Sequence, residues 1–558
     1  MSKSYMYDEC QDFSCDGNQE NNHNCRLSHI HSDKRDAKQD SKQQATISRR
    51  GMLQGLAVGS MGLVSAGLFA CAPSGGQANN QAYSNAQTAS SASEIKWDEE
   101  ADVVVVGSGG GLAGAITAAE AGLKVIVLEK DIAIGGSTNL HSGVISCGGG
   151  TSLQREAGID DNPEQYAKYL SACAKGQANE DILQILAREL PKTFEWVVSI
   201  GGKFSTEWLY FTGPEQEPYC TAVTPAIKHG AQYPPDEEHK TATGTLIHQL
   251  VVAEAERLAV DIRSESPALS LLLGKDGGPI GVVVKKGDEK VNIKASKGVL
   301  LASGGMCANP QMLAQYMRFG EQRVAAGAKL STGDGIKMGQ AAGADVVNMH
   351  ESLTSLQTAV PLGTTTRGKE RPAFPSILVN VSGRRFVNED YHSDTVGKLA
   401  LGQDDGITWQ IFDSKSYAAV SDANKPNVIQ AESIEELAQK IGVSTIGLTR
   451  TVALLNADAA AGEDSEYHKT GATFGALDSA PYYAFRAQCI AIVVHFGGLK
   501  VNTDFQVLSV HDEPIPRLFA AGLDAGGWLG RQYPGSGTAV GGTYTMSRLG
   551  VSKMISEA

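Results

Sequence analysis

A glycine-rich turn, Gly107-Ser108-Gly109-Gly110-Gly111, is the part of the sequence whose residue types are best suited to chemistry. Gly107 permits a tight turn, and Gly109 lets the backbone approach a pyrophosphate closely. A helix that begins at this turn supplies backbone N–H donors and the positive end of its dipole. Glu129, about twenty residues further on, is placed to reach the ribose hydroxyls of an adenosine. These residues predict a dinucleotide site.

The elements that must position this turn can be recognised on both sides of it. Residues 101–106 form a β-branched, apolar run of strand length. Residues 113–121 keep helical spacing, Gly122 ends the helix, and residues 124–128 form a second apolar strand. The third glycine of G-x-G-x-x-G falls on Leu112, so we expect the packing of helix against strand to be adjusted locally. The pattern predicts a βαβ unit.

Small and hydroxylated residues further along predict contacts with a second part of the same cofactor. They form the runs Gly135-Gly136-Ser137-Thr138-Asn139 and Ser142-Gly143. A site that extends this far favours FAD over NAD as the cofactor.

Composition excludes several other classes of protein. The chain has 558 residues, 42% of them hydrophobic and 20% charged, which is typical of a globular protein with a large core. A net charge of -14, without clustered lysines and arginines beyond the N-terminus, argues against nucleic acid as a partner. Nine cysteines form no C-x-x-C-H haem site, and we expect buried thiols and no metal. A metal site at Cys10, Cys15 and Cys25 is the alternative for the N-terminus.

The N-terminal region predicts an exported protein. Residues 1–47 are polar and are expected to be a disordered tail. Residues 48–71, which begin Ser48-Arg49-Arg50, resemble a twin-arginine signal, and Cys71 resembles the lipidated cysteine of a bacterial lipoprotein. A membrane-spanning anchor is the alternative, but the run is short and rich in glycine. Residues 72–97 would then be a flexible linker to a membrane tether, and FAD suits this location because it is bound before export.

From about Asp98 onward the chain resembles the fumarate reductase and 3-ketosteroid dehydrogenase family of FAD-dependent oxidoreductases. The motifs that carry the resemblance are residues 299–305 (VLLASGG), 331–335 (STGDG), 377–380 (ILVN), 385–390 (RFVNED) and 518–524 (LFAAGLD). The resemblance implies an α/β fold, with a Rossmann-like FAD-binding domain in two segments, 98–342 and 480–558. An inserted α+β capping domain, 343–479, would cover the active site.

The resemblance also assigns cofactor contacts. Asp524 takes the place of an acid near ribityl or ribose hydroxyls, and backbone amides of Thr538, Ala539 and Gly541 would face the flavin ring. The full set of expected FAD contacts is Gly107, Gly109, Gly110, Gly111, Glu129, Lys130, Gly136, Ser137, Thr138, Ser142, Gly143, Ala268, Ala302, Ser303, Gly304, Asp334, Gly522, Asp524, Thr538, Ala539 and Gly541.

Two positions argue against a dicarboxylate substrate. Fumarate-type members carry an arginine proton donor four residues beyond the glutamate of R-F-x-N-E, and a second arginine that clamps a carboxylate. Here Ser393 takes the first place and Tyr533 takes the second. A serine cannot replace a guanidinium as a charge clamp.

Residues 533–537 (YPGSG) instead resemble the Y-P-G-x-G stretch of ketosteroid dehydrogenases, in which the tyrosine hydroxyl and the second glycine's N–H bind a ketone oxygen. The resemblance implies that Tyr533 and Gly537 polarise a neutral ketone or enone. The alternative is that Tyr533 only packs against the flavin. Candidates for proton transfer are Tyr391, His392 and Ser393 in the cap, His350, and His495 beside a glycine pair; Tyr210 and Tyr219 are weaker candidates for a base.

The resulting functional hypothesis is an exported reductase of a carbon–carbon double bond conjugated to a carbonyl. The family exchanges a hydride with flavin N5 and a proton with a side chain. Electrons would come from a membrane-linked cytochrome or flavoprotein, with the unsaturated small molecule as respiratory acceptor. One alternative is a 3-ketosteroid dehydrogenase-type enzyme that introduces the double bond. Another is a non-catalytic electron-transfer flavolipoprotein.

Overall fold

The structure, a computed structural model, describes residues 95–236, 243–320, 324–325, 327–362, 365–366, 369–370, 374–470 and 473–557. The predicted tail, the predicted export signal with Cys71, and nearly all of the predicted linker lie outside these residues. Within them, no helix is long and apolar enough to cross a membrane, and no cluster of His, Cys, Asp and Glu could hold a metal ion.

A mostly parallel sheet carries the glycine turn. Its strand order is β20-β21-β9-β1-β2-β6, and β1 pairs in parallel with both β2 and β9. Val103, Val104 and Val105 of β1 are fully buried, as expected when both faces of a parallel sheet are covered. The strand bounds are β1 (Glu99–Val106), β2 (Val125–Leu128), β6 (Asp261–Arg263), β9 (Glu289–Leu301), β20 (Gln506–Leu508) and β21 (Pro514–Ala520).

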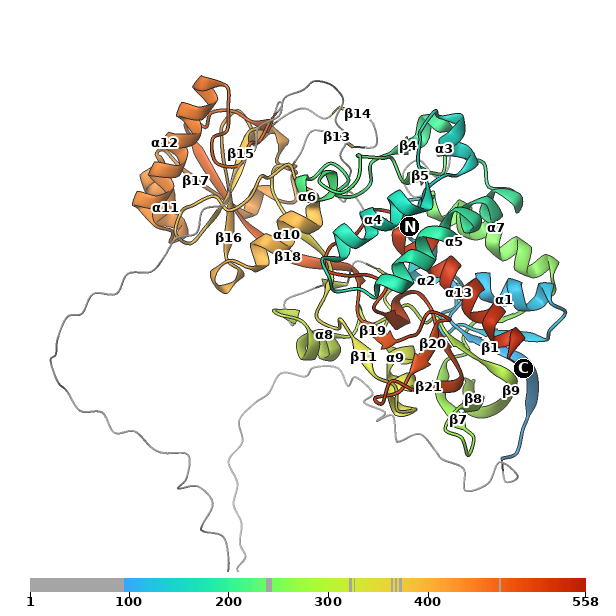
Figure 1. Ribbon diagram of the computed structural model, residues 1–558. Helices are drawn as coiled ribbons and strands as arrows, with labels where there is room; N and C mark the ends of the chain where they lie inside the picture. Colours follow the sequence, from blue (N-terminus) through green and yellow to red (C-terminus); the bar gives the residue numbers. More distant parts are fainter. Residues whose placement is uncertain are drawn as a thin grey trace, which may run out of the picture. The chain divides into compact units, whose positions relative to one another are not determined.

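Two helices from distant parts of the sequence pack together on this sheet. Helix α1 (Gly111–Glu120) and helix α13 (Thr538–Ser556) lie side by side (Figure 1, blue and red). A Cβ atom at Gly114 would lie 2.8 Å from the carbonyl oxygen of Ser547 in α13 and 3.0 Å from Leu300 in β9. The glycine that is absent at position 112 is therefore replaced by one at 114, which permits close packing of α1.

The remaining elements of this domain either extend this sheet, as β7 and β8 do through the pairing of β8 with β9, or surround it. They are α2 (Gly136–Asn139), β3 (Val144–Ser146), α3 (Ser152–Glu156), α4 (Pro163–Ala174), α5 (Glu180–Ser199), β4 (Leu209–Tyr210), α6 (Pro218–Thr221), β5 (Gly230–Gln232), α7 (Gly244–Arg257), β7 (Ala268–Leu273), β8 (Pro279–Lys286), α8 (Pro310–Tyr316), α9 (Asp334–Ala341), β11 (Val346–Val347), β19 (Gly498–Lys500) and β22 (Ala525–Gly526).

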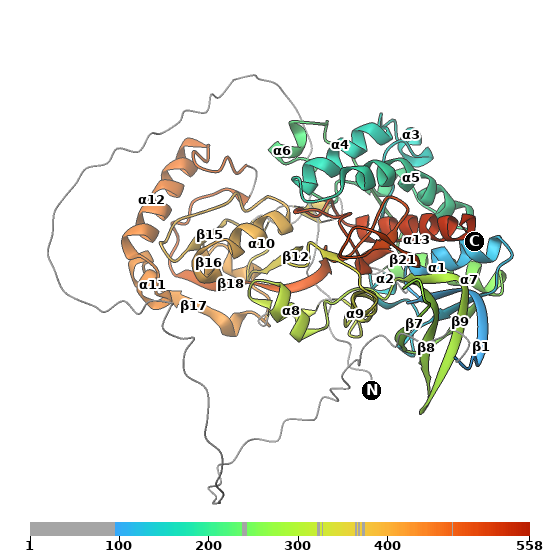
Figure 2. The ribbon, with the colours of Figure 1, turned by 60° about the horizontal axis from the view of Figure 1, so that its bottom comes forward.

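A second, largely antiparallel sheet forms the cap. Its strands follow the order β10-β18-β16-β15, with β12 and β17 also paired to β18. Helices α11 and α12 pack against it around Ile411, Leu437 and Leu448 (Figure 2). The bounds are β10 (Val324–Ala325), β12 (Ser352–Gln357), β15 (Ser376–Asn380), α10 (Ser393–Leu401), β16 (Thr408–Asp413), β17 (Val428–Ala431), α11 (Ile434–Ile441), α12 (Thr445–Ala461) and β18 (Tyr482–His495); β13 (Thr365–Thr366) and β14 (Lys369–Glu370) form a separate hairpin.

The predicted fold class, an α/β domain in two segments with an inserted α+β cap, is confirmed. The predicted boundary at residue 480 differs from the structure. Strand β18 pairs with β16 along residues 482–487, so it belongs to the cap sheet and not to the second α/β segment. The reason is that an apolar strand can complete either sheet, and the sequence does not show its pairing partner.

Candidate active site

One cavity of about 820 Å³ collects most of the predicted site residues. Its wall is formed by the glycine turn, the residues that follow β2, the loop before α13 and the start of α10. The volume lies in the range of pockets that hold cofactors and small molecules. Both segments of the α/β domain and the cap therefore contribute to one site.

The glycine turn leaves room for a ligand because side chains are excluded there. Gly107 has φ +107°, and a Cβ atom on it would overlap with the carbonyl oxygen of Ala302. A Cβ atom on Gly109 would lie 2.8 Å from Oγ1 of Thr138. Helix α1 begins at Gly111, so its first N–H groups point toward this end of the cavity. This cradle fits a pyrophosphate.

Charged side chains at this end are held in fixed positions. Oε2 of Glu129 accepts hydrogen bonds from Ser108 N at 3.2 Å and Ser108 Oγ at 2.6 Å, which ties the carboxylate to the glycine turn. Nζ of Lys130 donates to Oγ1 of Thr332 at 2.7 Å and to Oδ2 of Asp334 at 2.6 Å. Glu129 thus offers an oriented acceptor at the place expected for a ribose.

Most of the expected cofactor residues line the cavity. These are Gly107, Gly109, Gly110, Glu129, Lys130, Gly136, Ser137, Thr138, Ser142, Ala268, Ala302, Ser303, Gly304, Asp334, Gly522 and Ala539. Gly111, Gly143, Asp524, Thr538 and Gly541 are not part of the lining.

Asp524 lies behind the residues that line the cavity and holds a turn in place. Its carboxylate accepts hydrogen bonds from the backbone N–H groups of Ser303 and Gly305. Burial raises the pKa of Asp524 to about 6. In the structure its contacts support the turn that contains Ser303 and Gly304.

His141 also lines the cavity, although the sequence analysis did not select it. Its Nδ1 accepts a hydrogen bond from Gly143 N at 3.0 Å, so the neutral ring carries its proton on Nε2. That Nε2 is buried and has no hydrogen-bond partner among the described residues. Burial, together with His248, lowers the pKa of His141 to about 3. An unpaired donor on a polar cavity wall fits a bound dinucleotide. The feature of the sequence that could have identified His141 is its place between two runs of small residues.

The other end of the cavity presents two neutral donors. Ala539 N donates to the hydroxyl oxygen of Tyr533 at 3.0 Å, so the hydroxyl proton remains available to a ligand. Gly537 lies at the start of α13 with φ +89°, and a Cβ atom there would lie 2.6 Å from the backbone of Ile145. Within the described part of the chain, the N–H of Gly537 donates to no other group. Burial raises the pKa of Tyr533 far above its usual value, so the phenol keeps its proton.

Part of the cavity wall is apolar. The apolar side chains in it are Phe211, Leu353, Leu356, Pro361, Leu362, Val396 and Val494. Among the described lining residues, Lys130 is the one lysine or arginine, and it is paired at the opposite end with Asp334. The apolar side chains and the lack of an unpaired lysine or arginine in the described lining suit an uncharged ligand.

Three of the predicted proton-transfer residues lie together at the cavity wall, where α10 begins: Tyr391, His392 and Ser393. Nδ1 of His392 accepts from Asp394 N at 3.4 Å and caps the helix, and its ring also hydrogen-bonds the backbone of Thr212. Burial lowers the pKa of His392, so its ring is neutral near pH 7.

The two other histidines are not at the cavity. The side chain of His350 is 63% exposed and lies 3.7 Å from Glu351. His495 is fully buried, and its Nε2 accepts a hydrogen bond from Met306 N at 2.8 Å. Burial lowers the pKa of His495 to about 4. Tyr210 and Tyr219 are also absent from the lining.

Glu217 is a further residue that the sequence analysis missed. Its Oε1 accepts hydrogen bonds from His392 N at 2.9 Å and Thr395 Oγ1 at 3.0 Å, so it joins the segment before α6 to helix α10. Burial raises the pKa of Glu217 to about 7. A lone glutamate before a proline gives no pattern that could have identified it.

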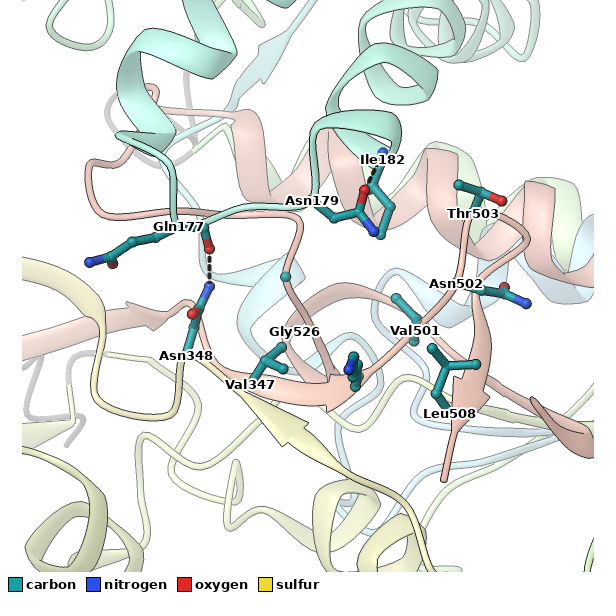
Figure 3. A pocket seen from close by; sticks show the side chains of 12 residues that line it. Gln177, Asn179, Ile182, Val347, Asn348, Val501, Asn502, Thr503, Leu508 and Gly526 are labelled. Atoms are coloured by element: carbon teal, nitrogen blue, oxygen red, sulfur yellow. Dashed lines mark hydrogen bonds between the residues drawn. The ribbon is translucent and has the colours of Figure 1, made fainter. Parts of the chain in front are cut away.

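A second cavity, of about 360 Å³, contains none of the predicted site residues (Figure 3). Nδ2 of Asn348 donates to the backbone oxygen of Gln177 at 2.6 Å, and the side chain of Asn179 accepts from Ile182 N at 3.4 Å to cap α5. These amides therefore support local structure, and the larger cavity is the candidate active site.

Comparison with known proteins identifies a matching family and several relatives of this chain. Residues 102–540 match the family described as FAD binding domain. NADH:fumarate oxidoreductase of Klebsiella pneumoniae (strain 342) is 28% identical over 438 residues, which cover 76% of this chain and 44% of that protein. 4-Oxocyclohexanecarboxylate 2-dehydrogenase of Sinomonas cyclohexanicum is 28% identical over 540 residues, which cover 80% of this chain and 92% of that protein. The chain thus spans less than half the length of the first of these relatives.

A solved structure is similar over almost its whole length. It is 3-ketosteroid-Δ4-(5α)-dehydrogenase from Rhodococcus jostii RHA1 in complex with 4-androstene-3,17-dione, which is 30% identical with a TM-score of 0.70. The match covers 83% of this chain and 99% of that one.

Proposed function

Because this chain belongs to the FAD binding domain family, we propose that its cavity serves the reduction of a carbon–carbon double bond conjugated to a neutral ketone. The chain is an FAD-dependent oxidoreductase that acts on CH–CH and C=C groups. We propose in addition that the substrate is a neutral ketone and that its double bond is reduced.

The chain's own residues would hold the cofactor along the polar side of the cavity. Backbone N–H groups of Gly109 and Gly110 and the positive end of helix α1 would bind the pyrophosphate, and Glu129 would bind the ribose. The N–H groups of Gly107 and Ser108 already donate to Leu128 O and to Glu129 Oε2. His141 would donate its Nε2–H to the cofactor, and the N-terminal end of α13 would offer it the positive end of a helix dipole. When bound, FAD supplies the hydride that one carbon of the double bond receives.

The observation that carries the ketone assignment is the pair of neutral donors at Tyr533 and Gly537. The Tyr533 hydroxyl is oriented by Ala539 N and keeps its proton, and the Gly537 N–H is unpaired within the described part of the chain. Both can donate to a ketone oxygen on which negative charge develops as the double bond is reduced. The apolar wall and the absence of a free cation among the described lining residues favour an uncharged substrate.

The proton for the second carbon comes from the group at the start of α10. His392 already uses its ring to cap the helix and to bond the backbone of Thr212. Among the described residues, Ser393 has no hydrogen bond to a basic group that would activate it. We therefore assign the transfer to the phenol of Tyr391, which lines the cavity.

We further propose that the electrons come from a membrane-linked cytochrome or flavoprotein outside the cytoplasm. This proposal is supported by the pair Arg49-Arg50 with the apolar run that follows it, and by Cys71. These residues lie outside the described part of the chain.

An anaerobic assay of the purified holoprotein tests the reaction. Reduced viologen would be the electron donor, and the panel would contain cyclic enones, steroid enones, acrylates and fumarate. We expect dye oxidation with neutral enones and little with fumarate. Failure of every compound to oxidise the dye contradicts the reductase and favours a non-catalytic electron-transfer role.

The Tyr533→Phe substitution tests the donor pair. Removal of one donor to a developing oxyanion lowers kcat by about 100- to 1000-fold. Tyr544→Phe is the matched control, because Tyr544 is also fully buried, and its hydroxyl has no partner among the described residues and does not line the cavity. If Tyr533→Phe retains flavin and full activity, the donor role is wrong.

A dehydrogenase that introduces the double bond is the second candidate. The similarity to the 3-ketosteroid dehydrogenase structure favours it, because the same donor pair can stabilise an enolate in either direction. The rate at which saturated ketones reduce a phenolindophenol dye would be compared with the rate at which reduced viologen reduces enones. A faster first reaction would establish the dehydrogenase direction instead.

A further inference from the structure

The capping helix α10 contacts the loop that carries Tyr533 through one buried carboxylate, Asp394. We propose that Asp394 is a positioning residue that sets Tyr533 against the substrate carbonyl when the cap is in place. This inference rests on the carbonyl-polarising role proposed for Tyr533. Asp394 is not part of the cavity lining, so it acts through Tyr533 and not on the substrate itself.

The contacts of Asp394 are directed at the backbone of this loop. Oδ2 accepts hydrogen bonds from Tyr533 N and from Gln532 Nε2, each at 2.9 Å. Oδ1 accepts from Thr354 N in β12 at 2.7 Å. Asp394 is fully buried, so these bonds are made away from water and hold the carboxylate in one orientation.

A second contact from the same face of α10 supports the ring of Tyr533. Lys398, four residues after Asp394, lies 3.2 Å from Asp394 and 3.4 Å from Glu351. Its Nζ also lies 4.6 Å from the centre of the Phe496 ring, and that ring stacks on Tyr533 with 5.9 Å between centres. Lys398 therefore balances the buried charge of Asp394 and contacts the aromatic ring on which Tyr533 rests.

The α/β domain holds the loop from the other side. Arg531 N donates to the backbone oxygen of Ala174 at 3.1 Å, and Gln532 N donates to that of Cys173 at 2.9 Å. The hydroxyl of Tyr169 donates to the backbone oxygen of Pro534. These bonds fix the loop to α4, whereas Asp394 fixes it to the cap.

The consequence is a link between the two halves of the reaction. Tyr391, His392 and Ser393 immediately precede Asp394 in the chain, so the carboxylate that holds Tyr533 belongs to the segment that carries the proposed proton donor. Proton donor and carbonyl donor are thereby placed by one short segment of the cap.

Asp394→Asn tests this role. The asparagine places an NH2 group where one carboxylate oxygen of Asp394 accepts hydrogen bonds, so the N–H donors on that side lose their acceptor. Asp413→Asn is the matched control: Asp413 is a fully buried cap carboxylate that accepts from the backbone of Lys415, Asp478 and Ser479. We expect Asp394→Asn to lower kcat on the order of 10- to 100-fold more than the control, with equal flavin content and a smaller change in KM. A kcat equal to that of the control overturns the proposal.

Binding provides a measurement that does not depend on turnover. Cyclohex-2-enone, a neutral probe, would be titrated into the oxidised holoprotein and followed by the flavin absorbance spectrum. We expect the dissociation constant of Asp394→Asn to rise severalfold relative to Asp413→Asn. An unchanged dissociation constant would contradict a displacement of the Tyr533 hydroxyl by Asp394→Asn.

The double variant Tyr533→Phe with Asp394→Asn separates this inference from the proposed function. If Asp394 acts through Tyr533, its substitution has little further effect on kcat once the hydroxyl is gone. If the two losses multiply, Asp394 acts independently and the inference is wrong. If Tyr533→Phe alone has no effect, the proposed function fails instead.

Discussion

At the scale of single residues, His141 offers the most direct test of cofactor binding. Its Nε2–H is buried, lacks a partner among the described residues and lies on the cavity wall. We expect His141→Ala to weaken FAD binding by about tenfold, the value of one hydrogen bond. The measurement is the flavin-to-protein ratio after dilution and gel filtration. His468→Ala is the control, because His468 does not line the cavity, and equal flavin loss in both variants would contradict the assignment.

The sequence could predict residues whose role depends on their immediate neighbours. The glycine turn and Glu129 follow from spacing within one βαβ unit, and the YPGSG run is recognisable as a motif. Asp394 and Glu217 could not be predicted, because their partners lie 139 and 175 residues away in sequence. His350 is a candidate by residue type and His495 by its place beside a glycine pair, and neither lines the cavity, because His350 is exposed and His495 is buried against Met306.

At the scale of elements, the cap depends on a buried ion-pair network. Arg385 donates to Glu389 and Asp464, each at 2.9 Å, and all three side chains are almost fully buried. Lys469 lies 3.4 Å from Glu389. The RFVNED motif therefore supplies structural support to the cap through Arg385 and Glu389, a role that motif spacing does not reveal.

Arg385→Met should destabilise the cap, because it leaves two carboxylates buried without their main partner. We expect a loss of about 3–5 kcal/mol in the free energy of unfolding. The exposed pair Arg257–Glu254, in which the arginine is 63% exposed, gives the control variant Arg257→Met, with an expected loss below about 1 kcal/mol. Guanidinium unfolding of both holoproteins at pH 7 measures the difference, and equal losses would contradict a stabilising network.

The assignment of strand β18 shows where sequence reasoning about elements reaches its limit. The resemblance gives the order of the domains, but the strand begins at Tyr482, just after the predicted boundary, and pairs back into the cap. Pairing is a long-range property that hydrophobic pattern does not specify when a strand can complete either of two sheets.

At the scale of the whole molecule, stability should depend on pH through Glu217, which connects the α/β domain with the cap. Burial raises its pKa from 4.5 to about 7. The unfolded chain therefore releases this proton at lower pH than the folded protein, and folding loses stability as pH rises from about 4.5 to about 7. The full loss is on the order of 3 kcal/mol.

Glu217→Gln removes this titration while it keeps an oxygen that can accept hydrogen bonds from His392 N and Thr395 Oγ1. The wild-type protein should lose stability relative to the variant between pH 5 and pH 8. Glu389 works in the opposite sense, because Lys469 and Arg385 lower its pKa against the effect of burial, but it is present in both proteins and cancels in the comparison. Urea unfolding of both holoproteins at the two pH values measures the change. A difference in stability that is the same at pH 5 and pH 8 would show that Glu217 does not titrate between them.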